Sequence, residues 1–294
     1  MFGAIEAGGT KFVCAVGTGP DNLQSEIRFP TTTPEETLQK CIKFFREQSK
    51  RHTLISLGIA CFGPIDLDPQ SSTYGYITST PKLGWQNTSI VKFFQNALEI
   101  PIAFDTDVNA AALGESQWGA GQGFDPLLYL TIGTGIGGGG IVNGAPLHGL
   151  LHPEMGHISI PHDWNADPFP GNCPFHGDCF EGLASGPAMK QRWGQPAETL
   201  PDNHPAWSLE AYYIARALAN LIYVVSPRRI VLGGGVMQNL ALFPLIRMEV
   251  QKALNQYVQS PAVLENIENY IVPPALGNRA GILGALALAM STIR

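Results

Sequence analysis

The residues best suited to hold a metal ion form a compact set in the second half of the chain. Cys173, His176 and Cys179 are spaced as Cys-x₂-His-x₂-Cys, and His157 lies ahead of them. In a cytosolic chain, two neighbouring cysteines are more typical of a metal site than of a disulfide, and four nitrogen and sulfur ligands suit tetrahedral zinc. Residues 161–172 have no hydrophobic period and would need such an anchor. The spacing therefore predicts a closed, structural zinc site, with an unliganded loop as the alternative.

Two glutamates, Glu154 and Glu181, flank this set on either side. A zinc-held loop would place both carboxylates where they can accept hydrogen bonds from the hydroxyl groups of a sugar. In the alternative interpretation, both are solvated surface groups. Three further histidines have no metal-binding partners at such spacing, and we interpret them as surface or capping residues: His148, His152 and His162.

A glycine run ahead of the metal set could bring bare backbone to a phosphate. Residues 133–140 carry six glycines in eight positions. Because a glycine inside a strand costs about 0.5–1 kcal/mol relative to alanine, a purely structural hairpin would not favour so many. Thr131 and Thr134 can add hydroxyl donors. The run lies between two strands rather than between a strand and a helix, so it is not a dinucleotide fingerprint.

Two shorter glycine segments leave two interpretations open. Gly8-Gly9-Thr10-Lys11 is either a plain hairpin turn or a second place where backbone N–H groups reach phosphate oxygens. Gly233-Gly234-Gly235 follows an apolar strand and is either a tight strand-to-helix turn or a nucleotide platform. No Walker loop of the form G-x-x-x-x-G-K-[ST] occurs in the chain.

The segment Asp105-Thr106-Asp107 ends a predicted strand and meets a helix. A carboxylate there can take a proton from a substrate hydroxyl. The dipole at the helix N-terminus favours the ionised form of Asp107. Simple capping of the helix by these residues is the alternative.

Composition narrows the classes of protein to which this chain can belong. It has 294 residues, 45% of them hydrophobic and 14% charged, so a large core is expected and disorder is not. The net charge of −6 without a basic cluster disfavours nucleic acid or an anionic membrane as the main partner. The N-terminus lacks the basic segment of a signal peptide, and the apolar run at residues 281–290 is about half of the ~20 residues that a membrane helix needs. We therefore expect a soluble, cytoplasmic protein.

Hydrophobic periodicity predicts alternating strands and helices. Strands are expected in a hairpin over residues 3–16, at 25–29, 54–61 and 102–105, in a second hairpin of 127–132 and 139–142, and at 229–232 and 269–272. Helices are expected at 34–50, 89–98, 108–118, 208–225, 239–257 and 280–291. Residues 66–87 have no period and predict a long surface excursion.

The order hairpin, strand, helix, strand, helix occurs twice. Each half carries a glycine turn between its first two strands, which predicts an α/β fold of two domains with mixed sheets flanked by helices. Two such halves would bind a ligand between them. We place the domain boundary in the glycine-rich segment that starts at residue 119, which gives a smaller domain of residues 1–118 and a larger one of residues 119–279.

Taken together, these motifs resemble the ROK family of sugar kinases (repressors, open reading frames, kinases) over nearly the whole chain. The matching segments are residues 6–11, 105–115, the Gly133 run, Glu154-Met155-Gly156-His157, residues 173–181 and Gly233-Gly234-Gly235. Glu-x-Gly-His followed by the metal set is the most specific of them. The bacterial zinc-containing fructokinase branch is the most similar part of the family.

The resemblance implies an actin-like ATPase fold, in which two ribonuclease-H-like domains close on ATP and sugar. It also implies that the last helix, residues 280–294, packs on the N-terminal domain. Asp107 would be the general base on the acceptor hydroxyl. The sugar would be held by Gly63 through its backbone and by Thr106, Glu154, His157 and Glu181, and His157 would also bind zinc through its other ring nitrogen.

The resemblance also implies where ATP and its magnesium ion lie. The phosphates would be held by Gly8, Gly9, Thr10, Lys11, Thr131, Gly133, Thr134, Gly135 and Gly137. The adenosine would be lined by Pro187, Gly233, Gly234, Gly235, Met237 and Gln238. A homodimer is a further family expectation.

The chain departs from the common family pattern at three positions. Glu6 stands where many members have an aspartate that positions magnesium, Thr106 stands where many have asparagine, and His176 replaces a third cysteine. All three departures fit the fructokinase branch and favour fructose over glucose. The expected reaction is therefore ATP-dependent phosphorylation of fructose to fructose 6-phosphate, with glucose, mannose or N-acetylmannosamine as alternative acceptors and a non-catalytic sugar-responsive regulator as the rival class.

Overall fold

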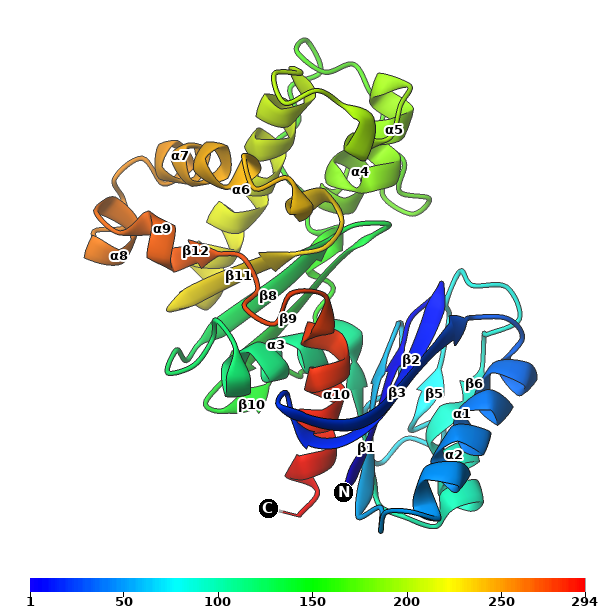
Figure 1. Ribbon diagram of the computed structural model, residues 1–294. Coiled ribbons are helices and arrows are strands. Elements are labelled where there is room, and N and C mark those ends of the chain that lie inside the picture. The colour runs from blue at the N-terminus through cyan, green and yellow to red at the C-terminus, as the bar shows by residue number, and fades with distance from the viewer. Residues whose placement is uncertain (294) are drawn as a thin grey trace. The chain divides into compact units, whose positions relative to one another are not determined.

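The computed structural model describes residues 1–293, which form two compact units. The first unit comprises Met1–Gln122, Ala145–Pro153 and the segment from Asn278 onward, and the second comprises Gly123–Gly144 and Glu154–Gly277. This division differs from the domain boundary expected after residue 118. Residues 119–122 and the segment Ala145–Pro153 belong to the first unit, and the two units are nearly equal in length. In both units helices flank a mixed sheet, as an α/β fold requires (Figure 1).

The sheet of the first unit has the strand order β3-β2-β1-β4-β7. Its strands are β1 (Phe2–Ala7), β2 (Lys11–Gly19), β3 (Asn22–Pro30), β4 (Ser56–Cys61) and β7 (Ile102–Thr106). β1, β2 and β3 are antiparallel neighbours, whereas β1, β4 and β7 are parallel. The predicted hairpin around Gly8-Gly9 is confirmed. Because β4 and β7 are parallel neighbours, their carboxyl ends lie at the same edge of the sheet, and the segments after Cys61 and Thr106 are brought together.

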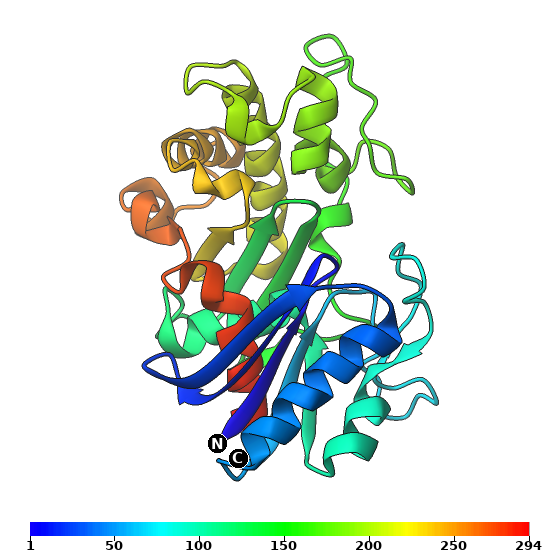
Figure 2. The ribbon, with the colours of Figure 1, turned by 45° about the vertical axis from the view of Figure 1, so that its right-hand side comes forward.

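Four helices cover the two faces of this sheet: α1 (Pro34–Ser49), α2 (Ile90–Leu98), α3 (Asp107–Trp118) and α10 (Ala280–Ser291). Figure 2 shows α1 and α2 on one face and α10 on the other. Side chains alternate along the strands, so Leu57 and Ile59 join the large apolar core with α1 and α2. Gly58, between them, faces α10. Small residues on this second face let α10 approach the sheet closely.

The close approach of α10 and α3 depends on glycine. A Cβ atom placed at Gly284 would lie 1.8 Å from the carbonyl oxygen of Ala110, and one at Gly114 would lie 2.9 Å from the backbone nitrogen of Gly284. Both helices consequently pack backbone against backbone. The hydroxyl of Ser56 donates to the Ala289 carbonyl and ties α10 to β4.

We expect Gly284→Ala to lower the free energy of unfolding by about 3 kcal/mol, because a packed backbone cannot move away from the added methyl group. Urea unfolding followed by circular dichroism measures this change. Gly19→Ala is the matched control, since a Cβ there meets nothing within 4 Å. A Gly284 variant as stable as this control would contradict the packing argument.

The excursion that follows β4 is better ordered than its composition suggests. It contains the two-stranded pair β5 (Tyr76–Ile77) and β6 (Thr88–Ser89). Trp85 is fully buried, and its indole N–H donates to the carbonyl of Thr32. A short strand, β10 (Ala145–Pro146), belongs to the separate segment of the first unit that ends at Pro153.

In the second unit, the strands follow the order β9-β8-β11-β12. They are β8 (Leu127–Ile132), β9 (Ile136–Val142), β11 (Arg229–Gly233) and β12 (Ile271–Val272). β9 begins at Ile136 rather than at the expected Gly139, because Gly137 to Gly140 pair in register with Thr131 to Leu128. The glycine turn is therefore only Gly133 to Gly135, and four glycines of the run lie inside a strand.

The helices of the second unit are α4 (Phe180–Ala184), α5 (Gly186–Trp193), α6 (Ala206–Val225), α7 (Leu242–Leu254), α8 (Pro261–Leu264) and α9 (Ile267–Tyr270). Short 3₁₀ turns are η1 (Met155–His157), η2 (Ala197–Thr199) and η3 (Val236–Gln238), and η4 (Gly277–Arg279) precedes α10. The helix expected over residues 239–257 is shorter, because Asn255 adopts a left-handed conformation (φ 44°) that ends it. Among residues 1–293, no helix is long and apolar enough to span a membrane.

Candidate active site and metal centre

Asp107 is the first residue of α3, directly after β7. Its Oδ1 accepts a hydrogen bond from the backbone N–H of Val108 (2.9 Å), and the side chain is half-buried. Thr106 caps the helix, since its hydroxyl accepts from the N–H of Asn109 (3.1 Å). The expected capping of the helix is therefore present, and Thr106 rather than Asp107 is the capping residue. The Asp107 carboxylate lies at the positive end of the helix, where an ionised group is favoured.

The backbone of Gly63 lies in the turn that follows β4 in the same unit. The buried ring of His152 lies over it, and a Cβ placed at Gly63 would be 3.4 Å from Cε1 of that ring. The Nε2 atom of His152 accepts from the N–H of Ile65 (3.2 Å). His152 is thus a buried structural residue, and its interpretation as a surface or capping histidine is wrong.

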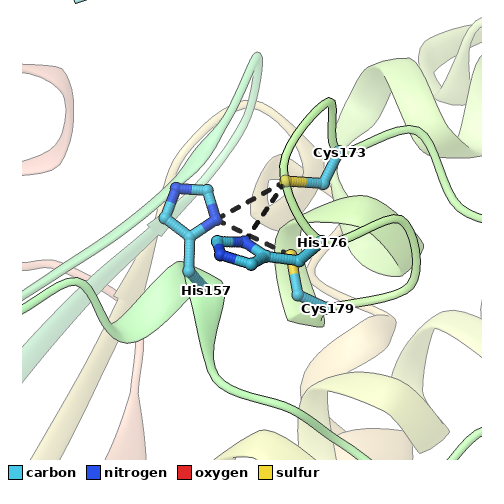
Figure 3. Close-up of side chains that lie close together, drawn as sticks. All are labelled: His157, Cys173, His176 and Cys179. Carbon is cyan, nitrogen blue, oxygen red and sulfur yellow. Dashed lines mark hydrogen bonds between the residues drawn. The ribbon is translucent and has the colours of Figure 1, made fainter. Parts of the chain in front are cut away.

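The four residues of the predicted metal set converge in the second unit (Figure 3). Nδ1 of His157 lies 3.7 Å from Sγ of Cys173 and 3.6 Å from Sγ of Cys179, and Nδ1 of His176 lies 3.6 Å from Sγ of Cys173. Zinc bonds of about 2.05 Å to nitrogen and 2.3 Å to sulfur at a tetrahedral angle would separate these atoms by about 3.6 Å. The donor atoms therefore fit a tetrahedral zinc ion.

The metal set also fits zinc chemically. Burial raises the pKa of the Cys179 thiol to about 11, so a thiolate ligand at neutral pH requires a bound cation. In Figure 3, Nδ1 of His157 faces the two cysteines and its other ring nitrogen faces away from them. That nitrogen, Nε2, is the one through which His157 could contact a substrate.

The loop that carries the cysteines has a second anchor. The buried carboxylate of Asp167 accepts from the hydroxyl of Tyr213 (2.6 Å) and forms an ion pair with Arg192 (3.1 Å). The buried His162 ring bonds to Asp178 (3.0 Å) and to the carbonyl of Asp167 (2.9 Å). His162 is therefore a core residue rather than a surface one, and side chains as well as a metal can hold residues 161–172.

Glu181 lies at the start of α4 and joins the metal set to the glycine hairpin. Its Oε2 accepts from the backbone N–H of Ile136 (2.8 Å). A Cβ at Gly135 would lie 2.7 Å from the same oxygen, so only glycine leaves room for this contact. Gly138 likewise gives room to Met155 of η1, whose sulfur a Cβ would approach to 2.6 Å. At least two glycines of the run thus serve packing, which the phosphate interpretation did not foresee.

We expect Gly135→Ala to lower the free energy of unfolding by about 1–3 kcal/mol, because the methyl group displaces the carboxylate of Glu181 from Ile136. The family resemblance implies that Glu181 contacts the sugar, so the same displacement should raise the KM for that sugar. Urea unfolding and steady-state kinetics measure the two effects. An unfolding free energy within about 0.5 kcal/mol of the wild type would contradict this contact.

Glu154 precedes η1 and is exposed at the surface of its unit. Its carbonyl accepts from the N–H of His157 (3.0 Å), so the Glu-x-Gly-His segment is one tight turn. Gly156 is required there, because a Cβ would lie 1.9 Å from the carbonyl oxygen of Ile136. The turn therefore presents Glu154 and His157 from one short element, beside the hairpin that Glu181 contacts.

A cavity of about 1260 Å³ lies within the second unit. Five of the residues expected to bind ATP line it: Gly133, Thr134, Pro187, Gly235 and Gln238. Its volume is sufficient for a nucleotide. Polar side chains that the sequence patterns did not single out also line it, namely Lys190, Glu198, Asp202 and Asn239. Of the cavity-lining residues in α5, the family resemblance had indicated Pro187 alone.

The remaining ATP candidates occupy different surroundings. A Cβ at Gly233 would lie 2.6 Å from the hydroxyl oxygen of Tyr129, and Gly234 has a φ of 96°. Packing against Tyr129 therefore explains Gly233 and the backbone conformation explains Gly234, whereas Gly235 lines the cavity. Met237 is buried. Three further candidates, Thr131, Gly135 and Gly137, belong to the β8–β9 hairpin.

The Gly8-to-Lys11 turn belongs to the first unit. The backbone N–H of Gly8 donates to the carbonyl of Lys11 (3.0 Å), while a Cβ at Gly9 would meet nothing within 4 Å. Glu6, two residues earlier, packs against Gly281 near the start of α10. Burial raises the pKa of the Glu6 carboxyl, although Lys11 and Arg28 oppose this.

Comparison with known proteins identifies the family of this chain. The family model of the ROK family matches residues 2–292. The chain is 51% identical over 294 residues to a putative fructokinase of Bacillus subtilis (strain 168), covering 100% of this chain and 97% of that protein. It is 45% identical to a fructokinase of Lactococcus lactis subsp. cremoris, covering 99% and 97%.

The chain belongs to the ROK family. Among solved structures, it is similar to the ROK hexokinase from Thermus thermophilus, with 26% identity, a TM-score of 0.81, and coverage of 99% of this chain and 98% of that one. The two sheets with their flanking helices are therefore those of the actin-like ATPase fold, as the family resemblance implied.

Two contacts of this ROK protein escaped sequence reasoning. His148, interpreted as a surface or capping residue, bonds to the buried Asp105 through Nε2 (2.9 Å). Glu181, which the resemblance implied as a sugar contact, accepts a hydrogen bond from the backbone N–H of Ile136. Both contacts join residues far apart in the chain, and no local spacing could have indicated them.

Proposed function

We propose that this chain is a fructokinase, which transfers the γ-phosphoryl group of ATP to the 6-hydroxyl of D-fructose. The observation that carries the proposal is identity of 51% and 45% to fructokinases over essentially the whole chain. The site supports it, because Asp107 stands at a helix N-terminus, where its carboxylate is kept ionised and can accept a proton, and because the second unit has a cavity large enough for a nucleotide.

In the proposed mechanism, Asp107 accepts the proton of the 6-hydroxyl as the hydroxyl oxygen attacks the γ-phosphorus. The bond between the γ-phosphorus and the β–γ bridging oxygen breaks, and ADP leaves. The hydrogen bond from Val108 fixes the orientation of the carboxylate. The sugar is oriented by Glu154, by Nε2 of His157 and by the second oxygen of Glu181, together with Thr106 and the backbone of Gly63. Correct orientation of the hydroxyl lowers the barrier because the attacking oxygen is already in line.

Backbone N–H groups stabilise the phosphates. We assign this role to Gly8, Gly9, Thr10 and Lys11 in the first unit and to the Gly133 turn with Thr131, Thr134, Gly135 and Gly137 in the second. The adenosine occupies the cavity beside Pro187, Gly235 and Gln238, near Gly233, Gly234 and Met237. Mg²⁺ bound with ATP would neutralise phosphate charge, with Glu6 the candidate to position it.

Zinc in the set of His157, Cys173, His176 and Cys179 has a structural role in this proposal. The closed four-ligand arrangement leaves no position for a substrate. Its effect on the reaction is indirect: it fixes the ring of His157 and the start of α4, and hence two sugar contacts. We further propose that the enzyme acts in the cytoplasm as a homodimer, which size-exclusion chromatography with light scattering would test.

The rival function is a sugar-responsive regulator without catalysis. It is disfavoured because Asp107 is present and positioned, whereas a sensor has no need of a base. The test is a coupled ADP-release assay with Mg-ATP against fructose, glucose, mannose and N-acetylmannosamine. Turnover led by fructose supports the proposal, turnover led by another hexose replaces the substrate, and no turnover on any of them favours the regulator.

A further inference from the structure

The carboxylate of Asp105 is buried and fully engaged. Only 2% of the residue is exposed. Its Oδ1 accepts from the backbone N–H of Thr106 (2.7 Å) and from the side-chain amide of Asn109 (2.9 Å), and its Oδ2 accepts from Nε2 of His148 (2.9 Å). A buried carboxylate requires such partners, because an unpaired charge in the interior is strongly unfavourable.

These contacts surround Asp107 on both sides. Asp105 lies two residues before it at the end of β7, and Asn109 lies two residues after it in α3. The bond between Asp105 and Asn109 therefore closes the strand-to-helix turn across Asp107. The hydroxyl of Thr106 adds a second closure to the N–H of Asn109. The direction of the Asp107 side chain depends on this turn.

His148 comes from a separate segment, Ala145–Pro153, which we call the strap. The strap touches the turn again at Leu147, whose carbonyl accepts from Asn109 (3.4 Å). Further along, His152 accepts from the N–H of Ile65 (3.2 Å) in the Gly63 turn. The strap thus braces both segments of the first unit that we assign to the sugar.

We propose that His148 is a positioning residue for phosphoryl transfer, acting through Asp105 to hold Asp107 in its reactive orientation. The inference rests on the proposed function, because it assigns His148 to the same reaction. The side chain of His148 is 43% exposed, so His148 is not a packing residue of the core. Its Nε2 atom supplies the hydrogen bond to Oδ2 of Asp105, the second oxygen of that carboxylate.

Charge supports the same role. The hydrogen bond to Asp105 raises the pKa of the His148 imidazole, so its protonated form, which pairs with the buried carboxylate, is more populated than in a free histidine. A charge-assisted bond of this kind is stronger than a neutral one. Glutamine at this position could still donate a hydrogen bond, whereas leucine could not.

The experiment compares kcat and KM for fructose and for ATP in the full chain and its His148→Leu, His148→Gln and Asp105→Asn variants. We expect His148→Leu to lower kcat about tenfold or more, since small misplacements of a reacting group are costly. The KM for ATP should stay within about twofold, because the nucleotide cavity is lined by the second unit. His148→Gln should retain kcat within about threefold of the wild type.

A double-mutant cycle tests the pathway. If His148 acts through Asp105, the double variant His148→Leu/Asp105→Asn should be no slower than the more impaired single variant. If the two residues act independently, the fold-losses in kcat of the two single variants should multiply in the double variant. His52→Leu is the matched control, since this half-buried histidine of the first unit belongs to neither the strap nor the site. Thermal unfolding of each variant separates loss of positioning from loss of fold, and His148→Gln remains informative where leucine unfolds the protein.

The outcomes separate the inference from the function on which it rests. A wild-type enzyme that phosphorylates no hexose overturns the proposed function and the role of His148 with it. An active wild type whose folded His148→Leu variant keeps its kcat overturns the positioning role alone. The positioning role is also overturned if the His148→Gln variant loses as much kcat as His148→Leu, or if the fold-losses in kcat of the two single variants multiply in the double variant.

Discussion

Replacement of Asp107 by asparagine should lower kcat for fructose at least 100-fold. Loss of a general base typically costs about 10²–10⁴ in rate. Asparagine keeps the size of the side chain and an oxygen that can accept from Val108, so the turn at the start of α3 should persist. The variant should therefore bind ATP normally, and steady-state kinetics with fructose and ATP would show the loss in kcat alone.

Asp21→Asn is the matched control for this prediction. Asp21 is an exposed aspartate in the turn between β2 and β3 of the same unit, and its replacement should leave kcat unchanged. Circular dichroism of both variants confirms that each is folded. An Asp107 variant with near-wild-type turnover would remove Asp107 from the role of base and leave the mechanism without one.

Replacement of Cys179 by serine should abolish tight zinc binding and raise the KM for fructose by about tenfold or more. Serine supplies no thiolate, and the three remaining ligands cannot complete the tetrahedron. The start of α4, where Glu181 lies, and the ring of His157 then lose their common anchor. Zinc content by atomic absorption and kinetics on the same preparation measure both effects.

The protein should stay folded in this variant, because Asp167, Arg192 and Tyr213 hold the other side of the loop. Cys41→Ser is the control. Cys41 is a buried cysteine of α1 whose thiol donates to the carbonyl of Thr37, so its loss removes a thiol without touching the metal set. A metal-free Cys179 variant with an unchanged KM would contradict the structural role of zinc.

The grouping of the metal set and the position of Asp107 were predictable because their signals are local. The close spacing of Cys173, His176 and Cys179 allows few arrangements, and the structure brings their donor atoms and that of His157 within 4.8 Å of one another. Likewise, a strand ending in Asp105 and a helix beginning near Asp107 place that carboxylate by periodicity alone. The alternation of strands and helices was enough to predict the α/β class.

Contacts between distant segments could not be predicted in this way. The bond from His148 to Asp105 spans two segments whose proximity depends on the folded unit. For the glycine run, the pattern was noticed but the reason given for it, close approach to a phosphate, was incomplete. Gly135 and Gly138 are required by the side chains of Glu181 and Met155, which lie far along the chain. Periodicity also missed α4 and α5, which are too short to show it.

The central claim is transfer of a phosphoryl group from ATP to the 6-hydroxyl of fructose, and ³¹P NMR of the reaction mixture tests it most directly. Purified enzyme with Mg-ATP and fructose should produce the resonance of fructose 6-phosphate in equal amount to ADP. The claim would be contradicted if the products were inorganic phosphate and ADP, if a different fructose phosphate formed, or if fructose remained unchanged.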